Sequence, residues 1–498
     1  MSYMGIDIGQ TGTKALVFDN KGNQIAYFYR EYETLFPREG WAELDSKRVM
    51  ESCFEVIKEA NTACKNNPVK AVAISSQGEA FTPVDKDGNI LYNAMITSDI
   101  RSSTVLKKCT QELGSRKLYE KTGHTPHTMF SLFKLLWLKE NEPEIFNKTW
   151  KFLCFEDLLQ FSLGLNPHIS WPLAARTMIF NIKQHKWDEE ILNYAGISED
   201  KLAVPVPSGI VVGNIKSNIA KSLGFKEKVN VVTAGHDQPV GALGAGVVEE
   251  GIAMYAIGTS EAVVPVFPTP VLSDKLYSSN LCTYDYTIEG LYTTVAFSLT
   301  GASILKWFRD EFGYEEVELS RKTGKNPYEI ILEKIPKDPT RLLVLPYFTP
   351  SGTPYFDSDV SGAIFGLRLS TTREEICRAL LEGVAYEIKL NLDILNETGI
   401  KIRGLIAIGG GAKSDIWLQL KADVLNKQIT KVKVTEAASL GAAMLAFAAD
   451  QKKDIKTIIK EWVKIDKTIN PITENGNFYN EQFKKYKGLY KLLKEIDL

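Results

Sequence analysis

The sequence predicts an α/β protein built from two similar domains that flank a cleft. A chain of 498 residues is longer than one hydrophobic core usually supports. Residues 3–18 have the pattern of a strand, a Gly-containing turn and a second strand, and residues 252–267 repeat it. The repeat divides the chain into predicted domains of residues 1–247 and 248–498.

The first hundred residues predict an α/β unit. A strand is expected near residues 24–33, after the Asp-Asn-Lys-Gly turn. Asp45 or Ser46 can cap a helix whose apolar residues recur on one face: Val49, Cys53, Val56, Ala60 and Cys64. Residues 69–75 are continuously apolar apart from Lys70 and Ser75, which is typical of a buried strand.

The later elements are read from the same patterns. A strand over 229–234 ends just before Asp237, and Pro239 suits the first turn of a following helix. The rest of the first domain predicts helices over 130–141 and 150–165 and an irregular stretch over 177–187. The second domain predicts helices over 302–312, 372–398, 415–426, 437–449 and at the C-terminal end, and strands over 342–347, 363–367 and 404–408.

Composition excludes several classes of partner. The net charge of -2 gives no reason to expect nucleic acid or an anionic membrane. The six cysteines are scattered without a CxxC pair, which predicts reduced thiols in a cytoplasmic protein. The apolar runs 231–248 and 437–449 are interrupted by Asp237 or too short to cross a bilayer.

The segment 231–248 carries the most informative polar residues. His236, Asp237 and Gln238 interrupt a run of apolar and small side chains, and a buried unpaired carboxylate is costly. Asp237 is therefore either a catalytic base at the mouth of a cleft or a structural cap of the next helix. Taken alone, the segment leaves both interpretations open.

Three glycine-rich turns could bind a nucleotide. In residues 7–14, DIGQTGTK, glycines can aim backbone N–H groups at phosphate and Asp7 could hold magnesium, although a plain polar hairpin also fits. The Gly-Thr-Ser turn at 258–260 could face it across a cleft. The glycine triplet at 409–411 could contact adenine or simply join a strand to a helix.

The ordered set DIGQTGTK, GHDQ, GTS and GGGAKSD resembles the FGGY family of carbohydrate kinases. Residues 129–141 and 362–382 are similar to two further patterns of that family, except that Leu380 stands where a smaller or β-branched residue is usual. The resemblance covers roughly residues 3–450. It implies two domains of the actin-like or ribonuclease H-like ATPase type, an N-terminal one for the sugar and the catalytic base, and a C-terminal one for the nucleotide.

The resemblance implies a kinase that uses ATP and Mg²⁺ to phosphorylate a sugar, with Asp237 as general base. It places magnesium near Asp7 and Asp237. The residues implied for the ATP phosphates are Thr11, Gly12, Thr13, Lys14, Gly258 and Thr259, and those for adenine are Gly410, Gly411 and Ala412. The residues implied for the sugar are Gln77, Gly78, Glu79, Asp99, Asp237 and Gln238.

Departures from the family pattern bear on the substrate. Gln10 stands where Thr or Ser is common, so that phosphate contact can differ. Gly78 and Thr97 replace larger side chains, which predicts a roomier pocket and a sugar larger or differently branched than glycerol. Ketopentoses, deoxyketohexoses and polyols stay open, as do a homodimer and whether His236 is functional or structural. The alternatives are a non-catalytic sugar sensor and an ATPase of the actin or heat-shock type.

Overall fold

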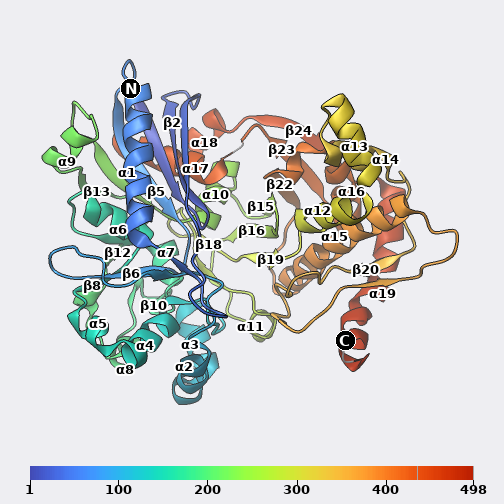
Figure 1. Cartoon of the computed structure of the whole chain (residues 1–498), viewed down its shortest axis with the longest axis horizontal. Helices are drawn as coiled ribbons and strands as arrows, with labels where there is room; N and C mark the ends of the chain where they lie inside the picture. The colour runs from blue at the N-terminus through green and yellow to red at the C-terminus, as the bar shows by residue number, and fades with distance from the viewer. Residues whose placement is uncertain (435, 497–498) are drawn as a thin grey trace.

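The computed structural model describes residues 1–434 and 436–496 as a mixed α/β protein with two large sheets (Figure 1). The first sheet has the order β13-β14-β5-β1-β2-β3. Its three central strands run parallel and are almost entirely buried, which explains their near-continuous apolar sequences. The strands are β1 (Ser2–Ile8), β2 (Gly12–Asp19), β3 (Gln24–Glu31), β5 (Val69–Ser76), β13 (Val211–Asn214) and β14 (Asn230–His236).

Helix α1 (Ser46–Ala63) covers one face of this sheet (Figure 1). Asp45 caps it, as one of the two predicted caps, by accepting hydrogen bonds from the backbone N–H groups of Lys47 and Arg48. Val49, Cys53, Val56 and Ala60 are fully buried, so the predicted apolar face is confirmed. Further helices of the first half are α2 (Ser103–Cys109), α3 (Ser115–Thr122), α4 (Ser131–Asn141), α5 (Pro143–Lys148), α6 (Phe155–Ser162), α7 (Trp171–Ala175), α8 (Glu189–Ala195) and α9 (Ser217–Ser222).

Small sheets brace these helices into a lobe at one end of the first sheet (Figure 1). The predicted helix over 150–165 is wrong at its start, because residues 151–154 form a strand that pairs with β6. The predicted irregular stretch contains the hairpin β10–β11. The strands are β4 (Glu43–Leu44), β6 (Phe81–Val84), β7 (Ala94–Met95), β8 (Lys151–Cys154), β9 (His168–Ser170), β10 (Phe180–Asn181), β11 (Lys186–Trp187) and β12 (Val204–Val206).

The second sheet has the order β17-β18-β16-β15-β22-β23-β24, with β19 also paired to β16. Strand β24 lies where a helical C-terminal end was predicted, because it pairs with β23 at the sheet edge. A separate hairpin joins β20 (Leu343–Leu345) to β21 (Ala363–Phe365). The strands of the sheet are β15 (Ile252–Ile257), β16 (Glu261–Phe267), β17 (Tyr284–Asp285), β18 (Tyr292–Thr293), β19 (Ala296–Ser298), β22 (Gly404–Ile408), β23 (Gln428–Val432) and β24 (Ile465–Ile469).

The long helix α15 (Arg373–Glu397) lies within the predicted range 372–398 and begins directly after its cap, Thr372. Thr372 accepts a hydrogen bond from the backbone N–H of Glu375, whose carboxylate accepts one from the backbone N–H of Thr372. The other helices of this half are α11 (Asp274–Ser278), α12 (Ala302–Phe312), α13 (Tyr314–Thr323), α14 (Pro327–Lys334), α16 (Asp415–Leu425), α18 (Ile455–Trp462) and α19 (Thr473–Ile496). None of the helices in the described parts of the chain is both long and apolar enough to cross a membrane.

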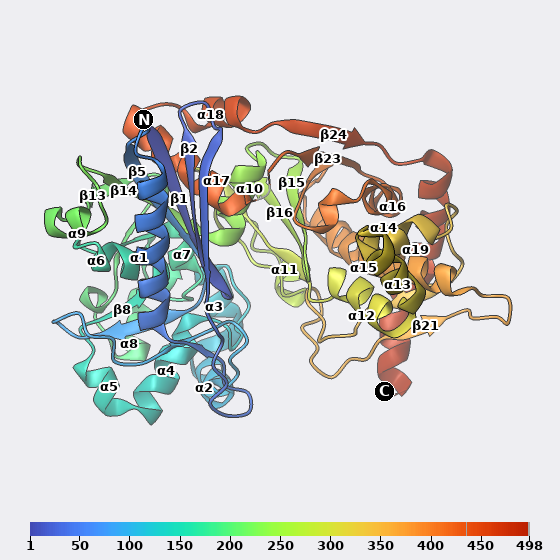
Figure 2. The same cartoon turned by 45° about the horizontal axis from the view of Figure 1, so that its top comes forward.

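Helices α10 (Asp237–Ala245) and α17 (Ala437–Gln451) lie between the two sheets (Figure 2). Glycines allow them to touch backbone to backbone: a Cβ added to Gly244 would lie 1.9 Å from the carbonyl oxygen of Ala437. A Cβ on Gly5 of β1 would lie 1.8 Å from the carbonyl oxygen of Ser439. Helix α17 therefore packs on the first sheet, although it follows the second sheet's strands in the chain.

Candidate active site

The parallel strands of the first sheet end at one edge, where the candidate residues collect. In the register of the sheet, Asp7 of β1 and Gly235 of β14 both pair with Ser75 of β5, and His236 pairs with Ser76. Ligands of open α/β sheets bind at the carboxyl ends of such strands. The chain continues from these ends into the turns at 9–12, 77–79 and 236–238.

A cavity of about 600 Å³ opens at this edge and is lined by both halves of the chain. Its polar lining includes residues that the sequence singled out, namely Gln77, Gly78, Glu79, His236, Asp237 and Gln238. Its apolar lining includes Phe130 from the first half and Val295, Phe297 and Phe356 from the second. The cavity thus combines hydrogen-bonding groups with apolar walls, which is typical of a small-molecule site.

Asp237 is the first residue of α10, and its side chain is 27% exposed. Burial, together with the smaller effects of the charges of Asp7 and Glu79, raises the pKa of its carboxyl to about 8 against the opposing charge of Arg176. A carboxyl group with a pKa shifted this far, in a cavity, is a candidate acid–base group.

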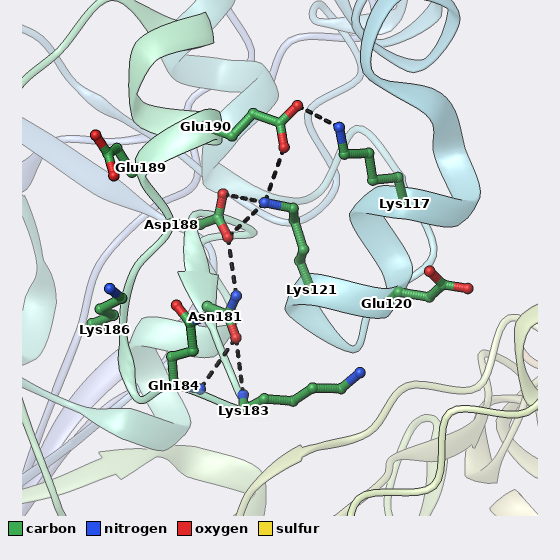
Figure 3. A pocket seen from close by; sticks show the side chains of 10 residues that line it. All are labelled: Lys117, Glu120, Lys121, Asn181, Lys183, Gln184, Lys186, Asp188, Glu189 and Glu190. Carbon is green, nitrogen blue, oxygen red and sulfur yellow. Dashed lines mark hydrogen bonds and ion pairs between the residues drawn. The ribbon is translucent and has the colours of Figure 1, made fainter.

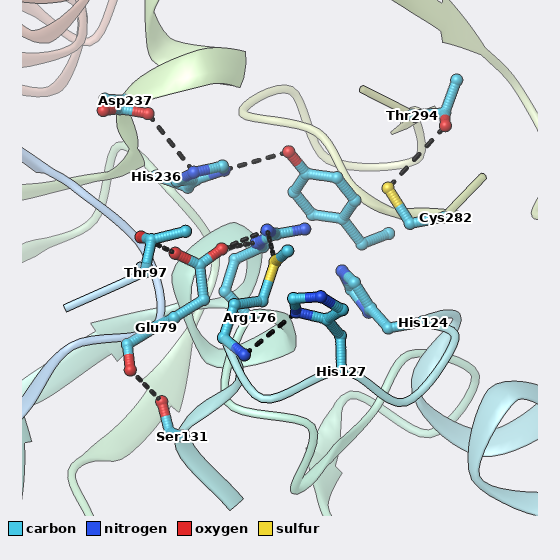
Figure 4. Close-up of polar contacts among 12 residues, drawn as sticks. Glu79, Thr97, His124, His127, Ser131, Arg176, His236, Asp237, Cys282 and Thr294 are labelled. Atoms are coloured by element: carbon cyan, nitrogen blue, oxygen red, sulfur yellow. Dashed lines mark hydrogen bonds and ion pairs between the residues drawn. The ribbon is translucent and has the colours of Figure 1, made fainter. Parts of the chain in front are cut away.

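Arg176 is the cavity residue that the sequence analysis missed. Its Nε donates a 2.6 Å hydrogen bond to Oε1 of Glu79, and its Nη2 contacts the same oxygen (Figure 4). Thr97 donates to Oε2 of Glu79 over 3.0 Å. Arg176 is the single charged residue in the apolar run 173–179, just as Asp237 is a charged residue within an apolar run.

Gly78 lines the cavity, and two side chains lie close to the place that its Cβ would take. A Cβ at Gly78 would lie 3.0 Å from Cδ2 of His236 and 3.3 Å from Cβ of Arg176. The imidazole ring and the arginine stem therefore occupy the space that a side chain at position 78 would fill. The small residue makes room for these two side chains, and its effect on the volume left for the sugar stays a prediction.

Asp7 and Lys14 face one another across the β1–β2 pair, where they are direct partners. Burial raises the pKa of Asp7 to about 6, against the opposing effects of Lys14 and of a 3.2 Å hydrogen bond donated by Ser75. Nζ of Lys14 forms an ion pair with Oε2 of Glu436 at 2.5 Å. Glu436 directly precedes α17, so this contact joins the first hairpin to the second half of the chain.

Each glycine turn is closed by a backbone hydrogen bond from its first glycine, although the first turn is one residue longer than the second. The backbone N–H of Gly9 donates to the carbonyl of Gly12 over 3.0 Å, and that of Gly258 donates to Ser260 over 3.0 Å. Gln10 and Ser260 line the cavity from the two halves. Thr11 and Thr259, at the turn tips, are exposed and available to a ligand.

The loop after β22 packs against the second glycine turn. Gly409 has φ +91°, and a Cβ there would lie 2.6 Å from the carbonyl oxygen of Ile257. Gly411 is as tightly packed, with Cγ2 of Ile257 at 2.3 Å from its added Cβ, and Ala412 is only 5% exposed. Gly410 is exposed and has no atom of the described residues within 4 Å of an added Cβ, so the open part of this loop is at Gly410.

Of the predicted site residues, only Gln77, Gly78, Glu79, Asp237 and Gln238 belong to the lining of this cavity, and two of the others, Thr13 and Asp99, are fully buried elsewhere. Thr13 is fully buried on the other face of β2 from Lys14, and its hydroxyl bonds that of Tyr32 at 3.2 Å. Asp99 is fully buried and accepts hydrogen bonds from the guanidinium of Arg101 and from the backbone N–H of Ala42. Asp99 therefore supports the loop whose neighbours line the cavity.

A second hollow, of about 590 Å³, lies on the surface beside α3 and α8 (Figure 3). Lys121 forms ion pairs with Asp188 at 2.7 Å and with Glu190 at 3.1 Å, and Lys117 contacts Glu190 as well. The charges of this hollow largely cancel one another, and none of the residues that line it belongs to the turns described above.

Two α/β halves with glycine turns and strand ends converging on one cleft define a protein of the actin-like ATPase type. Family models confirm this class: residues 2–244 match the N-terminal domain, and residues 253–449 the C-terminal domain, of the FGGY family of carbohydrate kinases. The chain belongs to this family and is therefore a phosphotransferase with an alcohol group as acceptor.

Individual relatives match the chain over nearly its full length. The chain is 30% identical over 503 residues to a xylulose kinase of Staphylococcus epidermidis, and the alignment covers 99% of this chain and 97% of the relative. It is 28% identical over 502 residues to a gluconokinase of Bacillus licheniformis, with 99% and 96% covered. A crystal structure of a xyloylose kinase from Brucella ovis superposes with a TM-score of 0.90 at 25% identity, over all of both chains.

Proposed function

We propose that this protein transfers the γ-phosphate of ATP to a hydroxyl of an uncharged sugar, a ketose such as a ketopentose or a polyol. The observation that carries the proposal is the carboxyl group of Asp237, whose pKa is raised to about 8 at the edge of a cavity lined by both halves. In its ionised form, a group with such a pKa is a stronger base than an ordinary carboxylate, as removal of a proton from a sugar hydroxyl requires.

Two amide oxygens support a polyhydroxylated substrate. Among the described residues, Oε1 of Gln77 and Oε1 of Gln238 are buried and have no hydrogen-bond partner, and both side chains line the cavity. Buried acceptors without partners are rare in native proteins, because each loses the free energy of hydration. Sugar hydroxyls beside Asp237 would donate to both oxygens.

The charge balance of the cavity favours an uncharged sugar over a sugar acid. Arg176 is the only lysine or arginine among the described residues that line the cavity, and Glu79 already neutralises it. A substrate carboxylate would have to compete with that buried partner and would lie near Asp237. Both effects weaken binding of an anion.

The glycine turns are proposed to hold the nucleotide. Thr11 and Gly12 of the first turn, Gly258 and Thr259 of the second, and Lys14 would contact the phosphates. The contribution of Thr13 is confined to its backbone, since its hydroxyl is buried. The loop of Gly410, Gly411 and Ala412 would lie against adenine, with its exposed backbone at Gly410.

The residues present fit a magnesium ion. Asp7 and Asp237 are carboxylates, the charge of Asp7 raises the pKa of Asp237, and a divalent cation held by these residues would favour their ionised forms. Magnesium in kinases commonly binds one or two carboxylates together with phosphate oxygens. When bound, the ion would neutralise charge on the phosphates.

In the proposed reaction, Asp237 removes the proton of the sugar hydroxyl as its oxygen attacks the γ-phosphorus in line and ADP leaves. The protein mainly positions groups and balances charge, since the transition state demands little covalent chemistry from it. The ammonium group of Lys14 offsets the negative charge of the phosphates. The apolar walls at Phe130 and Phe297 exclude water from the attacking oxygen.

The direct test replaces the base. Asp237→Asn keeps the shape of the side chain, and we expect kcat to fall by roughly 10²- to 10⁴-fold, the range of general-base assistance. ADP release would be measured over a panel of ketoses, polyols and aldonic acids. Titration calorimetry with ADP checks that the nucleotide site is intact.

Asp99→Asn is the matched control, because Asp99 is also a buried carboxyl but its side chain does not line the cavity. We expect it to change stability more than the chemical step. Near wild-type kcat in Asp237→Asn would remove the base from the proposal. Preference for an aldonic acid would remove the uncharged substrate.

A further inference from the structure

His236 lies between Asp237 and a tyrosine from the second half of the chain. Its Nδ1 is 3.0 Å from the hydroxyl oxygen of Tyr284, and its Nε2 is 3.3 Å from Oδ1 of Asp237. The ring is 5% exposed and Tyr284 is fully buried. The contact from Asp237 to the imidazole is visible in the close-up of the cavity (Figure 4).

The hydrogen-bond chemistry of these three groups admits one arrangement when Asp237 is ionised. An ionised carboxylate can only accept a hydrogen bond, so a ring that bonds it through Nε2 must carry a proton on that nitrogen. Burial keeps the hydroxyl of Tyr284 protonated, because it raises the pKa of that group. The hydroxyl therefore donates to Nδ1. Nε2 lies 3.3 Å from Oδ1 of the carboxylate, a close contact that lacks hydrogen-bond alignment in this structure and needs only a small rotation to gain it.

Gly78 is the sequence feature that admits this ring. Its added Cβ would come within 3.1 Å of Nε2, the atom that faces Asp237. Such an approach is tighter than most real Cβ contacts, so a methyl group at position 78 would push the imidazole by a few tenths of an ångström. The ring, its tyrosine partner and the glycine come from three separate parts of the chain and meet at one carboxylate.

We propose that His236 is a positioning residue. Tyr284 fixes which ring nitrogen carries the proton, and the ring orients the Asp237 carboxylate so that Oδ2 is left to accept the proton of the sugar hydroxyl. This inference rests on the proposed role of Asp237 as the base. The 3.3 Å distance suits a site without substrate, since catalytic hydrogen bonds often shorten in the reactive complex.

A role through Asp237 differs from direct contact with the sugar in what it predicts for kinetics. A residue that binds a sugar hydroxyl equally in the ground and transition states changes KM for the sugar. A residue that orients the base changes kcat and leaves KM for the sugar and for ATP nearly constant. A purely structural role for the ring changes stability and neither kinetic constant.

The test uses two amides that each replace one ring nitrogen. In His236→Gln the amide reaches the position of Nε2 and can donate to Asp237, whereas in His236→Asn it reaches the position of Nδ1 and can bond only Tyr284. We expect His236→Gln to keep kcat within about threefold of wild type. We expect His236→Asn to lower kcat by roughly 10- to 100-fold, the scale for a reacting group displaced by about 1 Å.

A double-mutant cycle shows whether His236 acts through the base. Adding His236→Asn to Asp237→Asn is expected to change kcat by less than about twofold, because residues that act as a unit are not additive. Tyr284→Phe and Gly78→Ala, which disturb the ring from its two sides, should each lower kcat with KM for the sugar unchanged. Circular dichroism and ADP binding check that each variant is folded.

The outcomes separate this inference from the proposed function. If Asp237→Asn retains full kcat, the base assignment fails and this inference with it. If Asp237→Asn is impaired, the inference alone is overturned by equal losses in the two His236 variants, by a better His236→Asn, or by a change confined to KM for the sugar.

Discussion

At the scale of single residues, the cavity combines charges that oppose one another. Asp237 lies within electrostatic range of two other carboxylates, Asp7 and Glu79, and of one guanidinium, Arg176. Burial and the two like charges favour the protonated form of Asp237, and the cation favours the ionised form. The balance leaves the group protonated below about pH 8, which is the opposite of what an exposed aspartate would do.

The pH dependence of turnover follows from that balance. The base must be ionised to accept a proton, so kcat/KM for the sugar should rise with pH and level off above about 8. Initial rates at saturating ATP across pH 5.5–9.5, taken as roughly the working range of general-base titrations, would show this limb. A profile that is flat from pH 6 upward would contradict the assignment of the raised pKa to the free enzyme.

At the scale of elements, glycines decide how closely helices and strands approach. Helices α10 and α17 touch through Gly244 and Gly441, and α17 touches β1 through Gly5. Strand β1 ends in the first glycine turn and α10 begins at Asp237. The contact layer between the sheets thus holds the two ends of the proposed site in register.

A methyl group at position 5 tests that layer. Gly5→Ala would place Cβ 1.8 Å from the carbonyl oxygen of Ser439, so β1 and α17 must separate. We expect a loss of about 1–3 kcal/mol in the free energy of unfolding, the range for overpacked sites. Urea or thermal unfolding would measure it.

Gly488→Ala supplies the contrasting variant. Gly488 lies within α19, and no atom of the described residues lies within 4 Å of an added Cβ. The change should stabilise the protein by about 0.5–1 kcal/mol, because alanine is the better helix former. Equal effects of the two substitutions would contradict the packing argument.

At the scale of the whole molecule, the two halves meet through polar contacts as well as through helices. Lys14 of the first sheet pairs with Glu436 of the second half, and their side chains are 28% and 25% exposed. The pair lies beside Asp7, so an anionic nucleotide at the first turn would meet two carboxylates and a lysine that already has a partner.

Glu436→Gln should therefore tighten the binding of ADP in the absence of Mg²⁺. The substitution removes one negative charge and frees Lys14, and a partly exposed pair of this kind is worth up to about 1 kcal/mol. We expect Kd to fall by roughly two- to fivefold in calorimetry, with the gap narrowing at high salt. The control is Glu481→Gln, an exposed carboxylate on α19. An unchanged or higher Kd for ADP in Glu436→Gln would contradict the proposed competition between Glu436 and the nucleotide for Lys14.

Much of the fold could be predicted because the relevant signals are local. A helix cap, a glycine turn and the spacing of apolar residues each depend on a few neighbouring residues, and Asp45, Thr372 and the turn at Gly9 all lie where those signals indicate. One such signal was overlooked. Alternation along a strand puts Thr13 and Lys14 on opposite faces, and the hydroxyl of Thr13 is accordingly buried.

The sequence by itself determined the class of fold and the glycine turns, and it singled out Asp237 as the candidate base. Only the tertiary structure decided that Arg176 neutralises Glu79 across 97 positions, that Lys14 meets Glu436 across 422, and that His236 fills the space beside Gly78. The physical reason is range: caps, turns and periodicity act over a few residues. The charge and shape of the cavity depend on which distant segments the packing of β1, α10 and α17 brings together.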